Sequence, residues 1–270
     1  MAKAFSVASW NVERFYGDPK RVDRVVDFLA RQSANIIALY EVSGNAVFGS
    51  ITSKMPNYTF HITEGPQTQE ILIGIKSGIT AFFTQKLEFK AGSSYLRPGA
   101  LVSITVDNKV YSLLFLHTKS GSDPKGLGLR DDMFYRAFKF RSVLDKKAGG
   151  AHKSNYIFLG DLNTMGMEYP YDHDIPAPDE IKRLNSRGSY RKMRVLDKDE
   201  PVTWSNGSGS TIPDSDLDQV VAAKHLVFKK FNGKDVAVRG WPKESTQAKK
   251  DTWINKYSDH GLLYFEVQKV

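Results

Sequence analysis

The chain has 270 residues, of which 41% are hydrophobic and 25% are charged, a composition typical of a globular protein with a substantial core. There is no cysteine, which excludes disulfides, thiolate metal sites and a cysteine nucleophile. Lysine and arginine outnumber aspartate and glutamate by 38 to 30, so the formal net charge is +8. This surplus favours a polyanionic partner such as nucleic acid or an acidic membrane surface.

No segment approaches the ~20 consecutive apolar residues that a membrane-spanning helix needs, so we expect no membrane span. The first twelve residues, MAKAFSVASWNV, lack the long apolar region of a signal peptide. The sequence as it stands predicts a cytoplasmic protein, and a secreted one if a leader has been removed.

The first predicted elements are a strand over residues 4–12, a helix that begins at Pro19 and a strand over 35–42. Asp18 is a suitable N-cap residue and proline is favoured at the first helical position. The spacing of apolar residues indicates that one helix face packs inward; this face carries Val22, Val25, Val26 and Leu29.

Three further runs, over residues 70–77, 100–107 and 109–120, are rich in β-branched and aromatic residues and predict strands. The last two are separated by the Asp107–Asn108 region, which predicts a hairpin. A glycine-bearing loop then leads into a helix over about residues 130–147.

The remaining predicted elements are strands over residues 156–163, 217–228 and 258–270, and the basic region between the first two of these strands is expected to be more irregular. Several neighbouring strands are joined without helices, which disfavours a doubly wound parallel sheet. We therefore predict an α/β fold of two packed mixed or antiparallel sheets flanked by helices. Residues 1–270 are expected to form a single catalytic domain that acts as a monomer.

Asp161 and Asn163 stand at the end of the apolar run YIFLGDLN. They can simply form a turn, because both residue types satisfy local backbone groups. Side chains at positions i and i+2 of an extended chain also point to the same face. The alternative hypothesis is that these two groups converge on one ligand.

Other acids, amides and histidines recur where apolar strands meet loops, a place where binding and catalytic residues concentrate. Each of them alone could be a surface or capping residue. The set comprises Asn11, Glu41, His117, Asp161, Asn163, Asp218, Asp259 and His260.

The motifs SWNVE, ALYEV, LRPGALVSI, LHTKSGSD, FLGDLNT, SDLDQVV and YSDHGLL resemble, in this order, those of the endonuclease/exonuclease/phosphatase superfamily, the deoxyribonuclease I-like fold. The resemblance extends from Asn11 to His260. It implies a four-layer sandwich and a divalent-metal-dependent phosphoesterase, and its details are closest to a bacterial-type nuclease.

The resemblance implies a metal site formed by Asn11 and Glu41, with Asp259 nearby. A hard cation held by few carboxylates is the usual arrangement for Mg²⁺, and Mn²⁺ can substitute for it. The sequence therefore predicts a Mg²⁺ cofactor.

The remaining motif positions imply catalytic roles around the substrate phosphate. Arg97 and the two histidines, His117 and His260, are expected to flank the phosphate. Asp161 and Asn163 are expected to position the attacking water and the phosphate. Asp218 is expected to pair with His260, and Asp216 is the alternative for that acid.

Three positions bear on which branch of the superfamily is closest. Tyr40 stands where the family has a glutamine before the metal-binding glutamate. Ile71 stands where the deoxyribonuclease branch has a tyrosine near the phosphate, which weakens close kinship to deoxyribonuclease I. His117 argues against the abasic-site endonucleases, which place a tyrosine there.

Basic residues outside the motifs are candidates for phosphate contacts, which fix a protein on nucleic acid without reading its sequence. An aromatic side chain among them could stack on a base. The alternative is a solvated basic face. The candidates are Lys119, Lys125 and Arg130 after His117, and Arg187, Tyr190 and Arg191 in the basic region over 182–194.

The favoured function is metal-dependent hydrolysis of DNA phosphodiester bonds, with RNA also considered. A phosphatase or a phospholipid phosphodiesterase of the same superfamily is the alternative, although no exposed apolar hairpin is evident for a lipid substrate. A non-catalytic binding module ranks last, because a protein that had lost catalysis would be expected to have lost some of the acids, amides and histidines named above.

Overall fold

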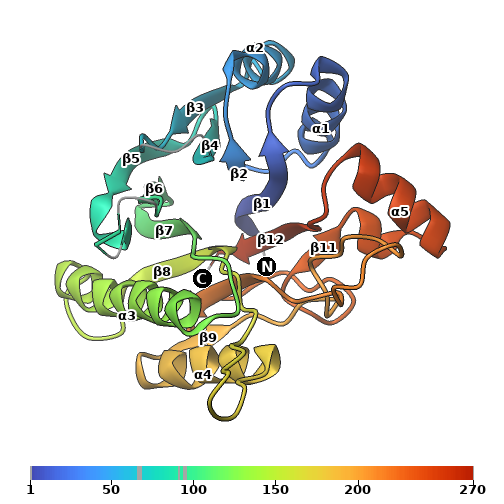
Figure 1. Ribbon diagram of the computed structural model, residues 1–270. Coiled ribbons are helices and arrows are strands. Elements are labelled where there is room, and N and C mark those ends of the chain that lie inside the picture. Colours follow the sequence, from blue (N-terminus) through green and yellow to red (C-terminus); the bar gives the residue numbers. More distant parts are fainter. Residues whose placement is uncertain (1, 66–68, 91, 94–95, 270) are drawn as a thin grey trace. The chain divides into compact units, whose positions relative to one another are not determined.

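The computed structural model describes residues 2–65, 69–90, 92–93 and 96–269. The chain forms two compact units, each containing one six-stranded sheet (Figure 1). The first unit comprises residues 1–79, 197–215 and 228–269, and the second comprises 80–196 and 216–227. That the whole chain acts as one catalytic domain stays a prediction.

The sheet of the first unit has the strand order β11-β12-β1-β2-β4-β3. Only β1 and β2 are parallel among its recorded pairs, and the other neighbours are antiparallel. Its strands are β1 (Lys3–Phe15), β2 (Ile36–Val42), β3 (Tyr58–Ile62), β4 (Glu70–Lys76), β11 (Ala237–Arg239) and β12 (Leu262–Gln268).

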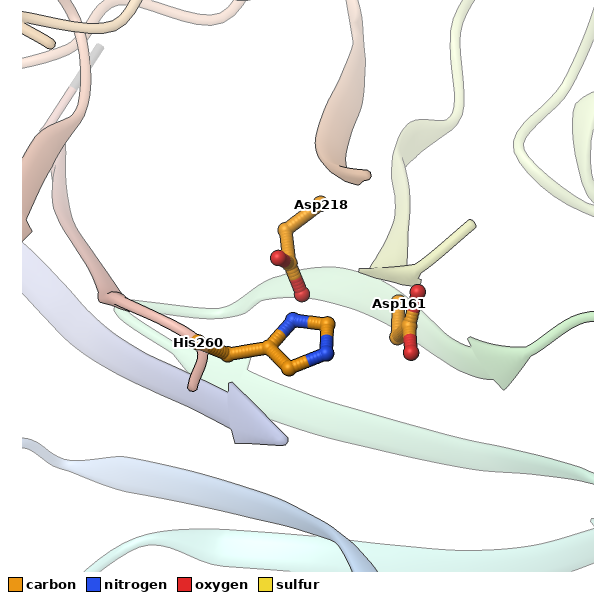
Figure 2. A group of neighbouring side chains, drawn as sticks. All are labelled: Asp161, Asp218 and His260. Carbon is orange, nitrogen blue, oxygen red and sulfur yellow. The ribbon is translucent and has the colours of Figure 1, made fainter. Parts of the chain in front are cut away.

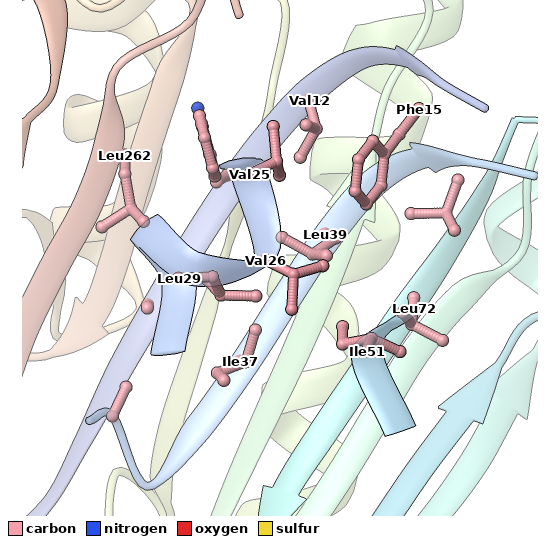
Figure 3. Packing of buried hydrophobic residues seen from close by; sticks show 14 of the residues in the cluster. Val12, Phe15, Val25, Val26, Leu29, Ile37, Leu39, Ile51, Leu72 and Leu262 are labelled. Atoms are coloured by element: carbon pink, nitrogen blue, oxygen red, sulfur yellow. The ribbon is translucent and has the colours of Figure 1, made fainter. Parts of the chain in front are cut away.

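Helix α1 (Pro19–Arg31) begins where the sequence predicted, since the Asp18 side chain accepts a hydrogen bond from the Lys20 N–H at 3.0 Å. Its apolar face, with Val25, Val26 and Leu29, belongs to the same buried cluster as Ile37 of β2 (Figure 3). Burying each such aliphatic side chain contributes about 1.5–3 kcal/mol, so this face anchors the helix to the sheet.

Two more helices belong to the first unit, α2 (Asn45–Lys54) and α5 (Gln247–Lys256), together with the short 3₁₀ helix η2 (Trp241–Lys243). The Thr246 side chain caps α5 by accepting from the Lys249 N–H. Neither α2 nor α5 was predicted from the sequence, because their apolar residues do not follow a clear helical period.

The sheet of the second unit has the strand order β5-β6-β7-β8-β10-β9. Its β7–β8 pair is parallel and its other recorded pairs are antiparallel. The strands are β5 (Thr80–Lys86), β6 (Gly99–Val106), β7 (Lys109–His117), β8 (Asn155–Asp161), β9 (Met193–Val195) and β10 (Asp218–Ala223). Both sheets are thus mixed, as predicted.

The predicted hairpin joins β6 and β7, whose antiparallel register closes with Val106 opposite Lys109. Its two central residues, Asp107 and Asn108, have φ values of 49° and 61°. Positive φ at both positions matches the right-handed twist of the flanking strands, and Asp and Asn tolerate it better than most residues.

Helix α3 (Pro124–Lys147) begins about six residues before the predicted start. The Asp123 side chain caps it by accepting from the Gly126 N–H at 2.9 Å. The glycines of this segment had suggested a loop, but the cap and Pro124 at the first position offset their low helical propensity.

The more irregular region predicted between the strands at 156–163 and 217–228 in fact contains a helix, because α4 spans Ala177–Tyr190. Asp179 and Glu180 lie in its first turn, where acidic side chains complement the helix dipole. Leu184 and Gly188 are buried along one side of the helix, so packing rather than propensity stabilises it. The second unit also contains the 3₁₀ helix η1 (Leu87–Lys90).

Within the described residues, no helix combines the length and the apolar character that crossing a membrane would require.

Candidate active site

Three polar side chains stand in one row across the sheet of the second unit. In the parallel β7–β8 pair His117 is the register partner of Asp161, and in the antiparallel β8–β10 pair Asp161 is the partner of Asp218. Asp161 and Asp218 appear side by side in Figure 2, at the end of β8 and the start of β10. Asp161 and Asp218 are 2% exposed and His117 is 5% exposed. Two carboxylates and an imidazole are therefore buried together at the ends of three neighbouring strands.

Asp161 is the centre of this row. Its Oδ2 lies 3.5 Å from His117 Nε2, and its Oδ1 accepts a hydrogen bond from the Asn163 N–H at 3.1 Å. Asn163 has a φ of 47° and donates from Nδ2 to the Thr118 carbonyl at 3.2 Å. An Asx-type turn therefore exists here, as the simple reading of GDLN predicted, and it also fixes the carboxylate and the amide beside His117.

Asp218 rather than Asp216 occupies the register position opposite Asp161. Asp216 precedes β10, and its backbone carbonyl accepts a hydrogen bond from the Thr164 hydroxyl at 2.6 Å. Of the two acids considered from the sequence, Asp218 is therefore the one that joins the row.

A second polar group lies in the first unit, where β1 and β2 depart from regular pairing after Asn11. Asn11 Nδ2 donates to Glu41 Oε1 at 3.3 Å, and the Arg14 N–H donates to Glu41 Oε2 at 2.9 Å. Glu41 has a φ of 63°, a strained value for a non-glycine residue that persists only where surrounding contacts determine it. The irregular register thus aims the amide and the carboxylate at one another.

Asp259 and His260, which precede β12, belong to the same unit. Two tryptophan indoles hold Asp259: Trp204 Nε1 donates to its Oδ2 at 2.7 Å, and Trp241 Nε1 donates to its backbone carbonyl at 3.0 Å. His260, also drawn in Figure 2, is 4% exposed, and its backbone carbonyl accepts from Trp10 Nε1 at 2.9 Å. Both predicted residues are therefore held in place by buried contacts.

Glu13 is a functional candidate that we did not single out from the sequence. Glu13 is exposed, but partial desolvation raises the pKa of its carboxyl, and the nearby carboxylates of Asp259 and Glu41 raise this pKa further, against the opposing charge of Arg21. Glu13 is part of the motif SWNVE, two residues beyond Asn11, but its φ of 41° departs from the extended backbone in which such positions share a face.

The donor set of the first unit fits a hard divalent cation. The Glu13 carboxyl lies near enough to those of Asp259 and Glu41 for their charges to raise its pKa, and the Asn11 amide oxygen accepts from the Glu13 N–H at 3.0 Å. Oxygen-only ligands of this kind suit Mg²⁺ or Mn²⁺, since softer metals favour sulfur and imidazole. A bound cation would relieve the repulsion.

Two predicted phosphate-binding residues lie near the row of His117, Asp161 and Asp218. Arg97 comes two residues before β6, which pairs with β7 so that Ala100 is opposite Phe115. Arg97 is therefore at the same end of the sheet as His117. Lys119 follows His117 by two residues and is half-buried.

The prediction that Arg130 contacts the substrate is corrected by its burial, because the side chain is 0% exposed. Its guanidinium forms an ion pair with Glu180 through two hydrogen bonds of 2.8 and 3.0 Å. The other donors reach the carbonyls of Lys119, Gly121 and Gly166. All five N–H groups are thus used inside the second unit, and Arg130 is structural. Lys125, in contrast, is exposed.

The other predicted nucleic-acid contacts lie on or just after α4. Tyr190 is 84% exposed, Arg187 pairs with Asp131, and Arg191 donates to the Ser142 hydroxyl at 2.9 Å. An open groove of about 450 Å³ runs along this helix; it is lined by Asp179, Lys182, Arg183, Ser186, Arg187 and Tyr190.

The two positions that depart from the family pattern are both buried. The hydroxyls of Tyr40 and Ser9 form a 3.0 Å hydrogen bond. Ile71 is 0% exposed in β4. Both side chains are therefore part of the packing of the first unit.

Comparison with known proteins finds similarity in structure only. No protein-family model matches the sequence, and no curated protein is significantly similar to it. Truncated TDP2 from Caenorhabditis elegans superposes with a TM-score of 0.68 at 16% identity, over 98% of this chain and 98% of that one.

Two further solved structures cover nearly the whole chain. TDP2 from Danio rerio, solved with a single-strand DNA product, has a TM-score of 0.65 at 16% identity, over 98% of this chain and 99% of that one. A mannosyl-6-phosphatase from Bacteroides thetaiotaomicron has a TM-score of 0.58 at 15% identity, over 97% and 99%.

The chain has the deoxyribonuclease I-like fold of the endonuclease/exonuclease/phosphatase superfamily. The predicted fold class and the resemblance drawn from the motifs are both confirmed at the level of the fold. One of the proteins that share it was solved with a single-strand DNA product and another is named a mannosyl-6-phosphatase, so the fold alone does not select a substrate.

Proposed function

We propose that this protein is a divalent-metal-dependent phosphodiesterase that hydrolyses DNA. The observation that carries the proposal is the row of His117, Asp161 and Asp218 across three neighbouring strands. Strand pairing holds these groups in a fixed geometry, which is what a hydrolase needs in order to orient water and phosphate.

The side chains of the second unit supply the chemistry at the phosphate. Asp161 can accept a hydrogen bond from water and orient it, while Asn163 and His117 can donate to phosphate oxygens. Asp218 is proposed to pair with His260 and to hold its imidazole in one orientation. Arg97 and Lys119 would add positive charge beside the phosphate.

The acids of the first unit are proposed to hold the cation, with Asn11, Glu41 and Asp259 as predicted and Glu13 in addition. Bound there, Mg²⁺ or Mn²⁺ would neutralise charge on the substrate phosphate as a Lewis acid.

A phosphatase acting on a small phosphomonoester is the second candidate. It is favoured by the similarity of the fold to the mannosyl-6-phosphatase from B. thetaiotaomicron. The net charge of +8 and the basic groove along α4 favour the polyanion instead.

Incubation with supercoiled plasmid is the test of the proposed activity. With Mg²⁺ or Mn²⁺ we expect nicked plasmid to accumulate, and with EDTA we expect none, because the cation is needed to neutralise the phosphate. Bis(p-nitrophenyl) phosphate and p-nitrophenyl phosphate serve as matched diester and monoester substrates. Intact plasmid together with hydrolysis of the monoester alone would replace the nuclease by the phosphatase.

Salt dependence tests the role of the groove along α4. Binding of single-stranded DNA should weaken steeply between 50 and 200 mM salt, through release of counterions from about six or more phosphates. Lys182→Gln and Arg183→Gln should each reduce the slope of log K against log salt by about one. The control is Lys234→Gln, whose lysine lies in the first unit beside Asp197. A slope unchanged by the α4 variants would remove the groove from the binding surface.

A further inference from the structure

The two carboxylate oxygens of Asp259 have different environments within the first unit. Oδ2 accepts a 2.7 Å hydrogen bond from the Trp204 indole N–H. Oδ1 lies 3.4 Å from the Ser258 hydroxyl and 4.0 Å from His260 Nε2. The single hydroxyl proton of Ser258 is committed to the shorter bond of 2.7 Å with the Asn11 carbonyl. Oδ1 is therefore the oxygen that is available to a cation.

The Trp204 indole is held firmly enough to impose this asymmetry. Trp204 and Ser215 exchange two backbone hydrogen bonds, both of 2.9 Å, and the Ser205 N–H donates to the Asp259 carbonyl at 3.0 Å. Thr203 and Ser205, on either side of Trp204, are 0% and 2% exposed. Backbone pairing thus fixes the indole N–H relative to Asp259.

A strong donor on one carboxylate oxygen disfavours that oxygen as a second ligand to a cation bound through the other oxygen. Mg²⁺ takes six ligands in octahedral geometry and few carboxylates, whereas Ca²⁺ takes six to eight oxygens and often binds a carboxylate through both. We infer that Trp204 is a positioning residue that keeps Asp259 monodentate and thereby favours Mg²⁺ over Ca²⁺. This rests on the proposed function, because it takes Asp259 as a ligand of the cation.

Calorimetric titration of MgCl₂ and CaCl₂ into the purified full chain tests the inference without any measurement of turnover. Trp204→Phe removes the N–H but keeps an aromatic ring, and we expect it to bind Mg²⁺ about tenfold more weakly, the size of effect that groups orienting metal ligands have. Its affinity for Ca²⁺ should stay or rise. Trp204→His, which restores a ring N–H, should recover part of the preference for Mg²⁺.

Trp241→Phe is the matched control, because its indole donates to the backbone carbonyl of the same Asp259. It should leave the ratio of Mg²⁺ to Ca²⁺ affinity unchanged. If Trp204→Phe fails to fold, as judged by thermal unfolding, Trp204→Leu is a second variant without the donor.

The outcomes separate the inference from the function on which it rests. An unchanged ratio in folded Trp204→Phe or Trp204→Leu, or an equal change in Trp241→Phe, overturns the role of Trp204 and leaves the metal centre intact. A wild-type protein that binds neither cation overturns the proposed metal centre and the inference with it.

Discussion

Asp161→Asn should lower kcat for the hydrolysis of DNA by about 10²–10⁴-fold, the range that positioned acid–base groups contribute. The amide keeps an oxygen that can accept from the Asn163 N–H, which Asp161 Oδ1 does at 3.1 Å. It loses the negative charge beside His117 Nε2, 3.5 Å away. The substitution therefore changes the chemistry of the group while conserving its shape and its turn.

The matched control for this prediction is Asp123→Asn, the same change at the exposed N-cap of α3. Asparagine caps helices about as well as aspartate, so this variant should keep the wild-type rate and stability. Steady-state kinetics on a fluorescent DNA substrate gives kcat and KM, and circular dichroism confirms the fold. Near-full activity of folded Asp161→Asn would show that the row of His117, Asp161 and Asp218 is not the reaction centre.

The parts of the fold that were predictable are those whose local signals agree with their packing. Helix α1 has an N-cap, a proline and an apolar face that is also the buried face. Helix α4 lacks such agreement, because Gly188 lowers helical propensity and its buried face includes the acid Glu180. Tertiary contacts decide its conformation, and a sequence window does not contain them.

The candidate site was predictable where a motif ends a strand, because strand register aligns such ends. This holds for His117 and Asp161, which are 44 positions apart in the sequence and pair directly. Glu13 was missed because its proximity to Asp259 follows from the pairing of β1 with β12, which are far apart in the sequence. The sequence after a motif does not show which of several basic side chains is buried, and so the role of Arg130 was misassigned.

Arg130→Met should lower the free energy of unfolding by about 3–5 kcal/mol, the usual cost of removing one partner of a buried ion pair. The variant leaves the Glu180 carboxylate buried without its guanidinium, together with the carbonyls of Gly121 and Gly166. Gly166 lies in a tight segment, since a Cβ there would clash with the Ile175 carbonyl. Loss of Arg130 should therefore loosen the path of the chain into α4.

Arg130→Lys separates this structural role from a contact with substrate. It keeps the positive charge but not the planar fork that binds Glu180 through two hydrogen bonds, so we expect it to be destabilised as well. Lys125→Met, at an exposed position of the same helix, should stay within about 0.5 kcal/mol of wild type. Urea unfolding measures all three variants. Wild-type stability of Arg130→Met together with weakened DNA binding would instead place Arg130 in the substrate-binding surface. The loss of a side chain whose donors all stabilise the fold cannot leave stability unchanged.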